Sequence, residues 1–212
     1  MYKKKFFFIV FEGVEGTGKS FQINKLFNYL NKRKISAIKT REPGGSTSAE
    51  KIRNLIFTKK NYFFHKLTDF YLMLASRNEH INKTLLLAKK KKLIVICDRF
   101  TDSTYAYQVI GKNIDKKLNE INKKYILGSI KPNLTIILKS NINTIIRRIK
   151  KRKRKNKFDK LDKKFYIKAQ KTFIKISKTR KNYFVFDSSA NDNVLEKKIF
   201  KIICSKLGLK YY

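Results

Sequence analysis

The stretch GVEGTGKS, Gly13 to Ser20, decides the fold of this chain. It lies between the apolar run FFFIVF and the amphipathic segment FQINKLFNYL. It fills every required position of the pattern G-x-x-x-x-G-K-[ST], which forms a phosphate-binding loop when a strand precedes it and a helix follows it. The sequence therefore predicts a P-loop that binds a nucleoside triphosphate, most simply ATP.

Each residue type in this loop has a physical role. Glycines let successive backbone N–H groups curl around a phosphate, and the helix N-terminus adds partial positive charge. Lys19 is expected to reach the β- and γ-phosphates, and Ser20 is expected to ligate Mg²⁺. The predicted ATP-binding residues are Gly13, Val14, Glu15, Gly16, Thr17, Gly18, Lys19 and Ser20.

Glu15 is unusual because a carboxylate beside phosphates is costly unless it binds a hydroxyl group or offsets nearby cations. Its position in the loop places it close to where a γ-phosphate would leave. The motif by itself leaves two interpretations open, a role at the reacting centre and an exposed loop residue.

Composition limits the possible partners. The chain has 212 residues, 42% of them hydrophobic, and a net charge of +37. Such a charge suggests nucleic acid or an anionic membrane. However, Lys far outnumbers Arg and is spread along the whole chain, as AT-rich codons would produce. We therefore expect no specific nucleic acid and no membrane as partner.

The cysteine content and the hydrophobic runs point to a cytoplasmic location. No run approaches the length of a membrane span. The two cysteines, Cys97 and Cys204, are too few for a disulfide framework and have no metal-ligand spacing. A reducing compartment is the default expectation for such a chain.

Apolar runs alternate with helical patterns along the chain. The runs, rich in β-branched and aromatic residues, are 6–11, 35–40, 93–98, 134–139 and 183–187. They are nearly continuous, which is typical of strands buried on both faces of a parallel sheet. Helical patterns cover 19–32, 47–57, 66–90, 114–127, 141–154, 160–180 and 192–206. The alternation predicts one α/β domain over residues 1–212 with right-handed crossovers.

Two residues stand at the end of the third predicted strand. Asp98 and Arg99 lie at the carboxyl edge of the sheet, where open α/β sheets bind ligands. Asp98 is placed to hold Mg²⁺ through water, and Arg99 is placed to bridge donor and acceptor phosphates. The next stretch, 101–108, puts hydroxyls, phenols and an amide on a helical turn, where they could contact a sugar or base or simply begin a helix.

Three further arginines indicate an acceptor site. The Pro-Gly-Gly turn after the second strand positions a loop, so that Arg41 and Arg53 are expected to flank a cavity opposite the P-loop. Arg77 lies on a long helix that is otherwise apolar on one face. If its side chain points inward it needs a partner, which a bound base or phosphate would supply.

The whole set of motifs resembles the bacterial thymidylate kinase family. The motifs are FEGVEGTGKS, REPGG with AEKIR, ASRNEH, DRF, STYAYQ with GKNID, and KPNLTIIL, in the family's order from residue 6 to about residue 139. The resemblance implies transfer of the γ-phosphoryl group of ATP to dTMP, giving dTDP, with Mg²⁺. It also implies a P-loop NTPase fold, with a five-stranded parallel sheet flanked by helices on both faces, and a homodimer.

The resemblance also implies roles for individual residues. Glu15 would contact the 3′-hydroxyl region of dTMP, and Arg53 and Arg99 would bind its phosphate. Tyr107 would crowd the 2′ position and disfavour ribose. Arg77, Thr104 and Gln108 would face the thymine, and Met73, where the family usually has a stacking Phe, would cover the ring with its thioether.

The basic run RRIKKRKRKNKFDK, residues 147–160, is interpreted as a small lid that closes on ATP. Family members whose P-loop lacks arginine take one from the lid, and GVEGTGKS has none. The candidates are Arg147, Arg148, Arg152 and Arg154, among which the register is not fixed. We place Arg152 with Lys19, Glu15 and Arg99 as the predicted catalytic residues. A solvated helix end is the alternative interpretation of this run.

Three alternative functions remain open at this stage. The chain could phosphorylate another nucleoside monophosphate or a deoxynucleoside. It could be a P-loop nucleic-acid-binding ATPase, as its charge allows, although one compact domain leaves little room for elements that move a polymer. It could also be a thymidylate kinase fold that has lost efficiency.

Overall fold

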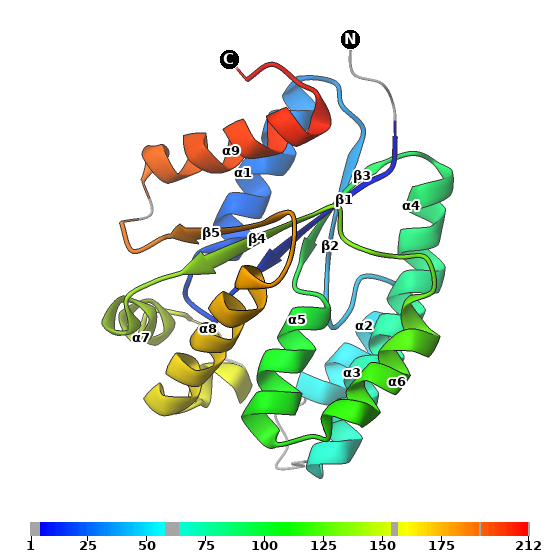
Figure 1. Cartoon of the computed structure of the whole chain (residues 1–212), viewed down its shortest axis with the longest axis vertical. Coiled ribbons are helices and arrows are strands. Elements are labelled where there is room, and N and C mark those ends of the chain that lie inside the picture. Colours follow the sequence, from blue (N-terminus) through cyan, green and yellow to red (C-terminus); the bar gives the residue numbers. More distant parts are fainter. Residues whose placement is uncertain (1–4, 58–63, 154–156, 191, 212) are drawn as a thin grey trace.

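A five-stranded parallel sheet with the strand order β2-β3-β1-β4-β5 runs through the computed structural model (Figure 1). The structure describes residues 5–57, 64–153, 157–190 and 192–211. The strands are β1 (Phe7–Glu12), β2 (Ala37–Arg41), β3 (Ile94–Asp98), β4 (Leu134–Lys139) and β5 (Tyr183–Asp187). They coincide with the five predicted runs, with small shifts at their ends, and the predicted α/β class with a parallel sheet is confirmed.

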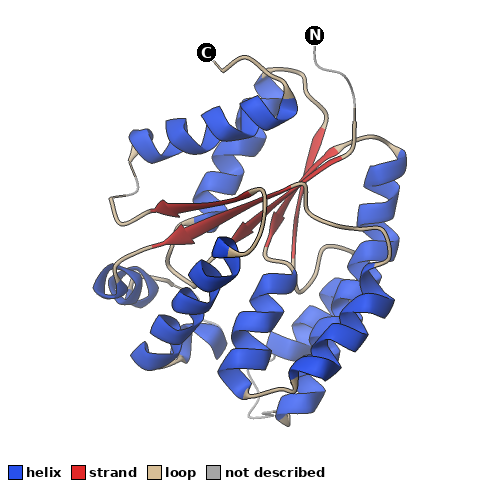
Figure 2. Ribbon diagram, in the orientation of Figure 1, coloured by secondary structure: helices blue, strands red, loops and turns tan. Residues whose placement is uncertain are grey.

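Helices cover both faces of this sheet (Figure 2). Two helices, α1 (Lys19–Lys32) and α9 (Asn193–Leu207), pack on one face. The helices on the opposite side of the sheet are α2 (Thr47–Phe57), α3 (Lys66–His80), α4 (Leu86–Lys90), α5 (Thr101–Thr104), α6 (Lys116–Leu127), α7 (Ile142–Lys150) and α8 (Lys163–Lys178).

Several predicted helices differ in their bounds. The pattern over 66–90 forms one helical run, in which a π-helical segment (Ile81–Leu85) joins α3 to α4. The pattern over 160–180 was too long at its start, because the Asp162 carboxylate accepts the Phe165 N–H and caps α8 there. The pattern over 141–154 was also too long, since α7 ends at Lys150.

The stretch predicted as a helical turn is longer than expected. Helix α5 continues into a π-helical segment (Tyr105–Ile110) and one further half-turn, so residues 101–112 form one helical run after β3. A short 3₁₀ segment (Lys157–Lys160) precedes α8.

Alternate side chains of the central strands fill the two sides of the core. On β1, Ile9 and Phe11 pack toward α1 and α9, whereas Phe8 and Val10 pack toward the opposite helices. The prediction of burial on both faces holds for β1, β3 and β4 and is wrong for β2 and β5. Those two strands lie at the edges of the sheet, where each has only one neighbouring strand.

The carboxyl ends of β1, β2 and β3 meet at one edge, since all three strands run parallel in neighbouring positions. The segments that leave this edge are Gly13–Ser20, Glu42–Gly45 and Arg99–Ser103. Among the described residues, none of the helices has the length and apolar character needed to cross a membrane.

Candidate functional site

The loop after β1 has the backbone of a phosphate-binding loop. Gly13 has φ +136°, and a Cβ atom there would lie 2.3 Å from the Leu138 carbonyl oxygen, so a larger residue would clash with β4. The Lys19 Nζ donates to the carbonyl oxygens of Gly13 and Val14, at 2.9 and 3.0 Å. The lysine therefore folds back over the loop where a phosphate would lie.

Lys19 lies in an environment suited to an anion. Burial, and then the nearby Arg99 guanidinium, lower the pKa of Lys19 to about 8. A bound phosphate would favour the protonated, positively charged form of Lys19. The role of this side chain is therefore to bind an anion rather than to pack in the core.

Ser20 and Asp98, the predicted metal ligands, lie together. The Ser20 Oγ donates to the Asp98 Oδ2 at 3.1 Å. The other carboxylate oxygen, Asp98 Oδ1, is buried and has no hydrogen-bond partner. Two oxygen ligands of this kind suit Mg²⁺, which takes few protein ligands and completes its shell with water and phosphate oxygens.

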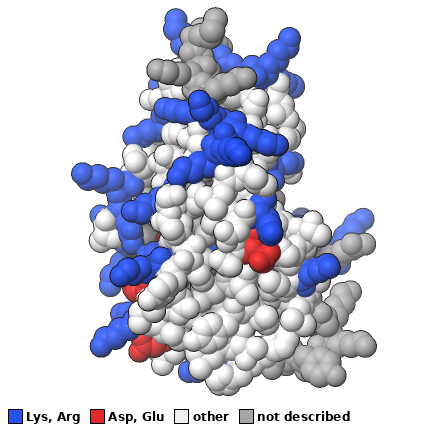
Figure 3. All heavy atoms as spheres, turned by 90° about the vertical axis from the view of Figure 1, so that its right-hand side faces the viewer, with Lys and Arg blue, Asp and Glu red and all other residues white. Residues whose placement is uncertain are grey.

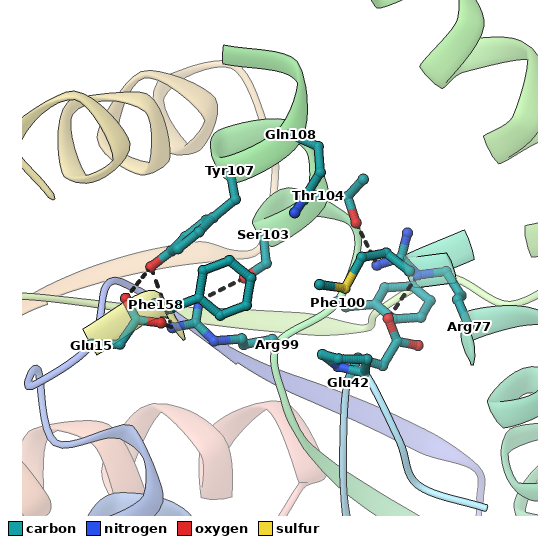
Figure 4. Close-up of a pocket in the computed structure, with 12 residues that line it drawn as sticks. Glu15, Glu42, Arg77, Arg99, Phe100, Ser103, Thr104, Tyr107, Gln108 and Phe158 are labelled. Carbon is teal, nitrogen blue, oxygen red and sulfur yellow. Dashed lines mark hydrogen bonds and ion pairs between the residues drawn. The ribbon is translucent and has the colours of Figure 1, made fainter. Parts of the chain in front are cut away.

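Arg99 lies at the centre of the site (Figure 4). Its Nη2 donates to Glu15 at 2.6 Å and to the Tyr107 hydroxyl at 3.4 Å, and its Nη1 donates to the Ser103 Oγ at 2.9 Å. Burial would lower the pKa of Arg99, but the Glu15 carboxylate holds it above the usual value. Glu15 is therefore buried and paired, and the interpretation of an exposed loop residue is wrong.

A cavity of about 40 Å³ lies beside Arg99. It is large enough for only a few water molecules. Of the predicted acceptor-binding residues, five line it besides Arg99: Met73, Arg77, Thr104, Tyr107 and Gln108. The remaining lining residues are Glu15, Glu42, Pro43, Phe100, Ser103 and Phe158.

Arg77 points inward from α3, as expected, and its partner is a protein carboxylate. Its Nε donates to Glu42 at 2.7 Å and its Nη2 to the Thr104 hydroxyl at 2.9 Å. Burial raises the pKa of Glu42, but Arg77 and His80 together lower it below its usual value, so the carboxylate stays charged. Arg77 therefore has a partner within the protein, where the sequence pointed to a bound base or phosphate.

Arg53 lies behind the cavity wall rather than on it. Its Nη1 donates to the Pro43 carbonyl at 2.6 Å, and its guanidinium stacks on Phe57 at 4.5 Å. Burial and then Arg41 lower the pKa of Arg53 to about 10. Arg41 itself pairs with Glu50 at 2.8 Å and flanks a separate hollow that includes Ser20 and Asp98.

The described parts of the basic run predicted as a lid, residues 147–153 and 157–160, lie at the rim of the site. Arg152 pairs with the buried carboxylate of Asp159 at 2.7 Å. Arg148 donates to the carbonyl oxygen of Gly16 in the phosphate loop at 3.2 Å and to those of Ser188 and Ser189. Arg147 is exposed on α7, and Arg154 lies outside the described residues.

A family model for thymidylate kinase matches residues 11–199 of this chain. The chain belongs to the thymidylate kinase family. A thymidylate kinase of Thermosipho melanesiensis is 35% identical over 94% of this chain and 98% of its own. One from Ehrlichia ruminantium is 39% identical over 89% of this chain and 92% of its own.

A crystal structure of thymidylate kinase from Ehrlichia chaffeensis shares the fold. It superposes with a TM-score of 0.76 at 29% identity, covering 94% of this chain and 99% of that one. The predicted P-loop NTPase fold is therefore confirmed, and so is the resemblance to the thymidylate kinase family.

Sequence reasoning missed several residues of this thymidylate kinase site. Glu42 is part of the REPGG motif. Its contact with Arg77 joins two segments that lie 35 residues apart in the chain, so no local pattern indicated it. Phe100 and Ser103 adjoin predicted residues, so their chain positions offered a signal. Phe158 offered none, because it enters the cavity from the lid segment and contacts the Tyr107 ring at 5.4 Å.

Proposed function

We propose that ATP lies along the phosphate loop and that dTMP enters the cavity beside it, with Arg99 between their phosphates. The reaction follows from the family: the chain transfers the γ-phosphoryl group of ATP to dTMP, forming dTDP. One observation carries the proposed arrangement. Glu15 belongs to the phosphate loop, lines the cavity and pairs with Arg99, so the two halves of the site meet at this ion pair.

On the donor side, all residues from Gly13 to Ser20 bind ATP, and Lys19 neutralises charge on the β- and γ-phosphates. Ser20 and Asp98 would hold Mg²⁺, and the unpaired Oδ1 of Asp98 supports this. When bound, the ion neutralises charge that develops on the phosphate oxygens. Among the described residues there is no group of three or more His, Cys, Asp or Glu that could hold a metal, so most ligands would come from phosphate and water.

On the acceptor side, Arg99 binds the dTMP phosphate directly, because its planar fork suits paired oxygens. Arg53 also serves the dTMP phosphate. It adds positive charge from its place behind Pro43, or its side chain turns into the cavity when the phosphate binds. Glu15 contacts the 3′-hydroxyl group of dTMP. Tyr107 lies against the 2′ position of the sugar and so disfavours ribose. Arg77, Thr104 and Gln108 face the thymine, and Met73 covers its ring.

The elements packed around one sheet support a single kinase domain, 1–212, with a lid at about 147–160. In this proposal the lid excludes water and brings Arg152 to the transferring phosphoryl group. A cytoplasmic location fits the use of ATP. It also fits the two cysteines, which are buried and not joined in a disulfide.

A panel of acceptors tests the proposed function. In a coupled assay with ATP and Mg²⁺, kcat/KM for dTMP is expected to exceed the values for dUMP, dGMP and thymidine, and chelation of Mg²⁺ is expected to stop turnover. Added DNA is expected to have no effect. A preference for thymidine would indicate a nucleoside kinase. DNA-stimulated ATP hydrolysis without dTDP formation would indicate a nucleic-acid ATPase.

The surface supports a homodimer. Figure 3 shows the side of the molecule formed by α4, α6 and their neighbours. Lys and Arg gather on its upper part, whereas a broad area of its lower part carries few charges although the chain has a net charge of +37. Helices α2, α3, α4 and α6 carry most of the exposed large apolar residues: Leu55, Leu67, Tyr71, Leu86, Leu87, Ile121 and Tyr125. A sparsely charged, partly apolar face of this kind suits a self-complementary interface.

A charge placed on this face is expected to separate the dimer. Sedimentation should give a mass twice the 25.1 kDa of one chain, and Ile121→Glu should shift it toward one chain. Val194→Glu is the matched control, since Val194 on α9 is 55% exposed, as Ile121 is. A wild-type protein that sediments as a single chain, or equal effects of the two variants, would contradict this interface.

A further inference from the structure

Glu12 is a buried carboxyl group to which the catalytic scheme gives no role. It is the last residue of β1, directly before the phosphate loop, and it is 0% exposed. Each of its oxygens is hydrogen-bonded to the segment that follows β3. Glu12 therefore ties the end of one strand to the turn that carries Arg99.

The first set of hydrogen bonds holds the backbone around Arg99. Arg99 has φ +74°, a left-handed conformation that persists in a residue other than glycine only when its surroundings enforce it. Its own N–H donates to the Phe11 carbonyl at 2.9 Å. The next N–H, of Phe100, donates to Glu12 Oε1 at 2.8 Å, so β1 holds the peptide groups on both sides of Arg99.

The second set of hydrogen bonds connects Glu12 to the side chain of Arg99 through Ser103. The Ser103 N–H also donates to Glu12 Oε1, at 3.2 Å, and the Ser103 Oγ lies 2.6 Å from Glu12 Oε2. The same Oγ accepts the Nη1 of Arg99 at 2.9 Å. Ser103 is therefore held at its backbone and its hydroxyl, and it directs the guanidinium toward Glu15.

We propose that Glu12 is a positioning residue, which holds the Arg99 turn and, through Ser103, aims the Arg99 guanidinium at the acceptor phosphate. This inference rests on the proposed binding of the dTMP phosphate by Arg99. It requires the length and the acceptor oxygens of the Glu12 side chain, and it does not require a negative charge there. Burial, and then the nearby Asp102, raise the pKa of Glu12 to about 8, in keeping with a group whose charge is not needed.

The test compares three changes. Glu12→Gln keeps the length and an oxygen that can accept both backbone N–H groups. Glu12→Asp keeps the acid but is too short to hold them in the same place, and Ser103→Ala removes only the hydroxyl. Ser140→Ala is the control, because it also removes a buried hydroxyl at the end of a strand, here β4, and this hydroxyl contacts Ser189 rather than Arg99.

Glu12→Asp is expected to lower kcat/KM for dTMP by about 10- to 100-fold, as a displaced positioning group does. Ser103→Ala is expected to lower it by about 10-fold, and Glu12→Gln is expected to stay within about threefold of wild type, while KM for ATP changes less than about twofold in all variants. Binding of dTMP without ATP, measured by calorimetry, should weaken in the same order.

Equal damage in Glu12→Gln and Glu12→Asp would overturn the proposal, and so would parallel changes in the KM values for ATP and dTMP. If Glu12→Asp does not fold, the comparison of Ser103→Ala with Ser140→Ala decides, and equal dTMP kinetics in these two variants would overturn it. Failure of the wild-type protein to phosphorylate dTMP would instead count against the proposed function.

Discussion

Replacement of Lys19 by alanine is expected to lower kcat by about 10³-fold, the scale expected when a main donor to developing charge is removed. Lys19 is buried, yet the hydrogen bonds of its Nζ go to carbonyl oxygens of its own loop. Lys19 therefore contributes to catalysis by placing a positive charge where the phosphates of ATP bind. The sheet and its two apolar layers do not depend on this side chain, so the variant should keep a cooperative thermal transition.

Lys25→Ala provides the matched control for this experiment. Lys25 lies on the same helix, is exposed and pairs with Glu196 at 3.4 Å, remote from the loop. We expect this variant to retain wild-type turnover, since an exposed ion pair contributes little. Near-normal kcat in Lys19→Ala, with dTDP still formed, would contradict the assignment of the phosphate loop.

The sequence predicted the central elements well because their signals are local. The apolar runs of β1, β3 and β4 and the glycine-rich turn each lie within one short segment, so periodicity and turn chemistry identify them. The edge strands β2 and β5 contain similar runs, and only the strand order shows that they are half-exposed. Local composition does not encode that order.

The site was predictable where one motif supplies it and unpredictable where distant segments meet. Lys19, Ser20 and Asp98 follow from motif and strand end, and the structure brings Ser20 and Asp98 together. The pairing of Glu42 with Arg77 depends on how α3 packs beside β2, which no local pattern specifies. For the same reason the position of Phe158 in the cavity was not foreseen.

The lid is the second place where a large effect is expected. Its three described arginines have different surroundings: Arg148 contacts the phosphate loop and Arg152 pairs with Asp159, whereas Arg147 is exposed. The acceptor cavity of about 40 Å³ has Phe158 in its wall. Phe158 narrows this cavity, and we expect the segment that carries it to shift when a nucleotide enters.

Changing Arg147, Arg148, Arg152 and Arg154 together to Gln is expected to lower kcat by about 10³-fold, with a much smaller effect on dTMP binding. In the proposed arrangement the lid supplies a guanidinium to the transferring group, because the phosphate loop has no arginine of its own. The neighbouring lysines Lys150, Lys151 and Lys153 provide the control, because their change to Gln removes similar charge from the same segment. If the run were only a solvated basic surface, both multiple variants would keep their activity.

Restoring one arginine at a time to the fourfold variant identifies the residue that acts on the phosphoryl group. Restoration of Arg152 is expected to recover most of kcat, because Asp159 can hold its guanidinium at the rim while the lid moves as a unit. Arg148 donates to three backbone carbonyls, so its restoration should chiefly recover thermal stability. Recovery of kcat by Arg148 instead would mean that those carbonyl contacts open when ATP binds and that the catalytic role belongs to α7.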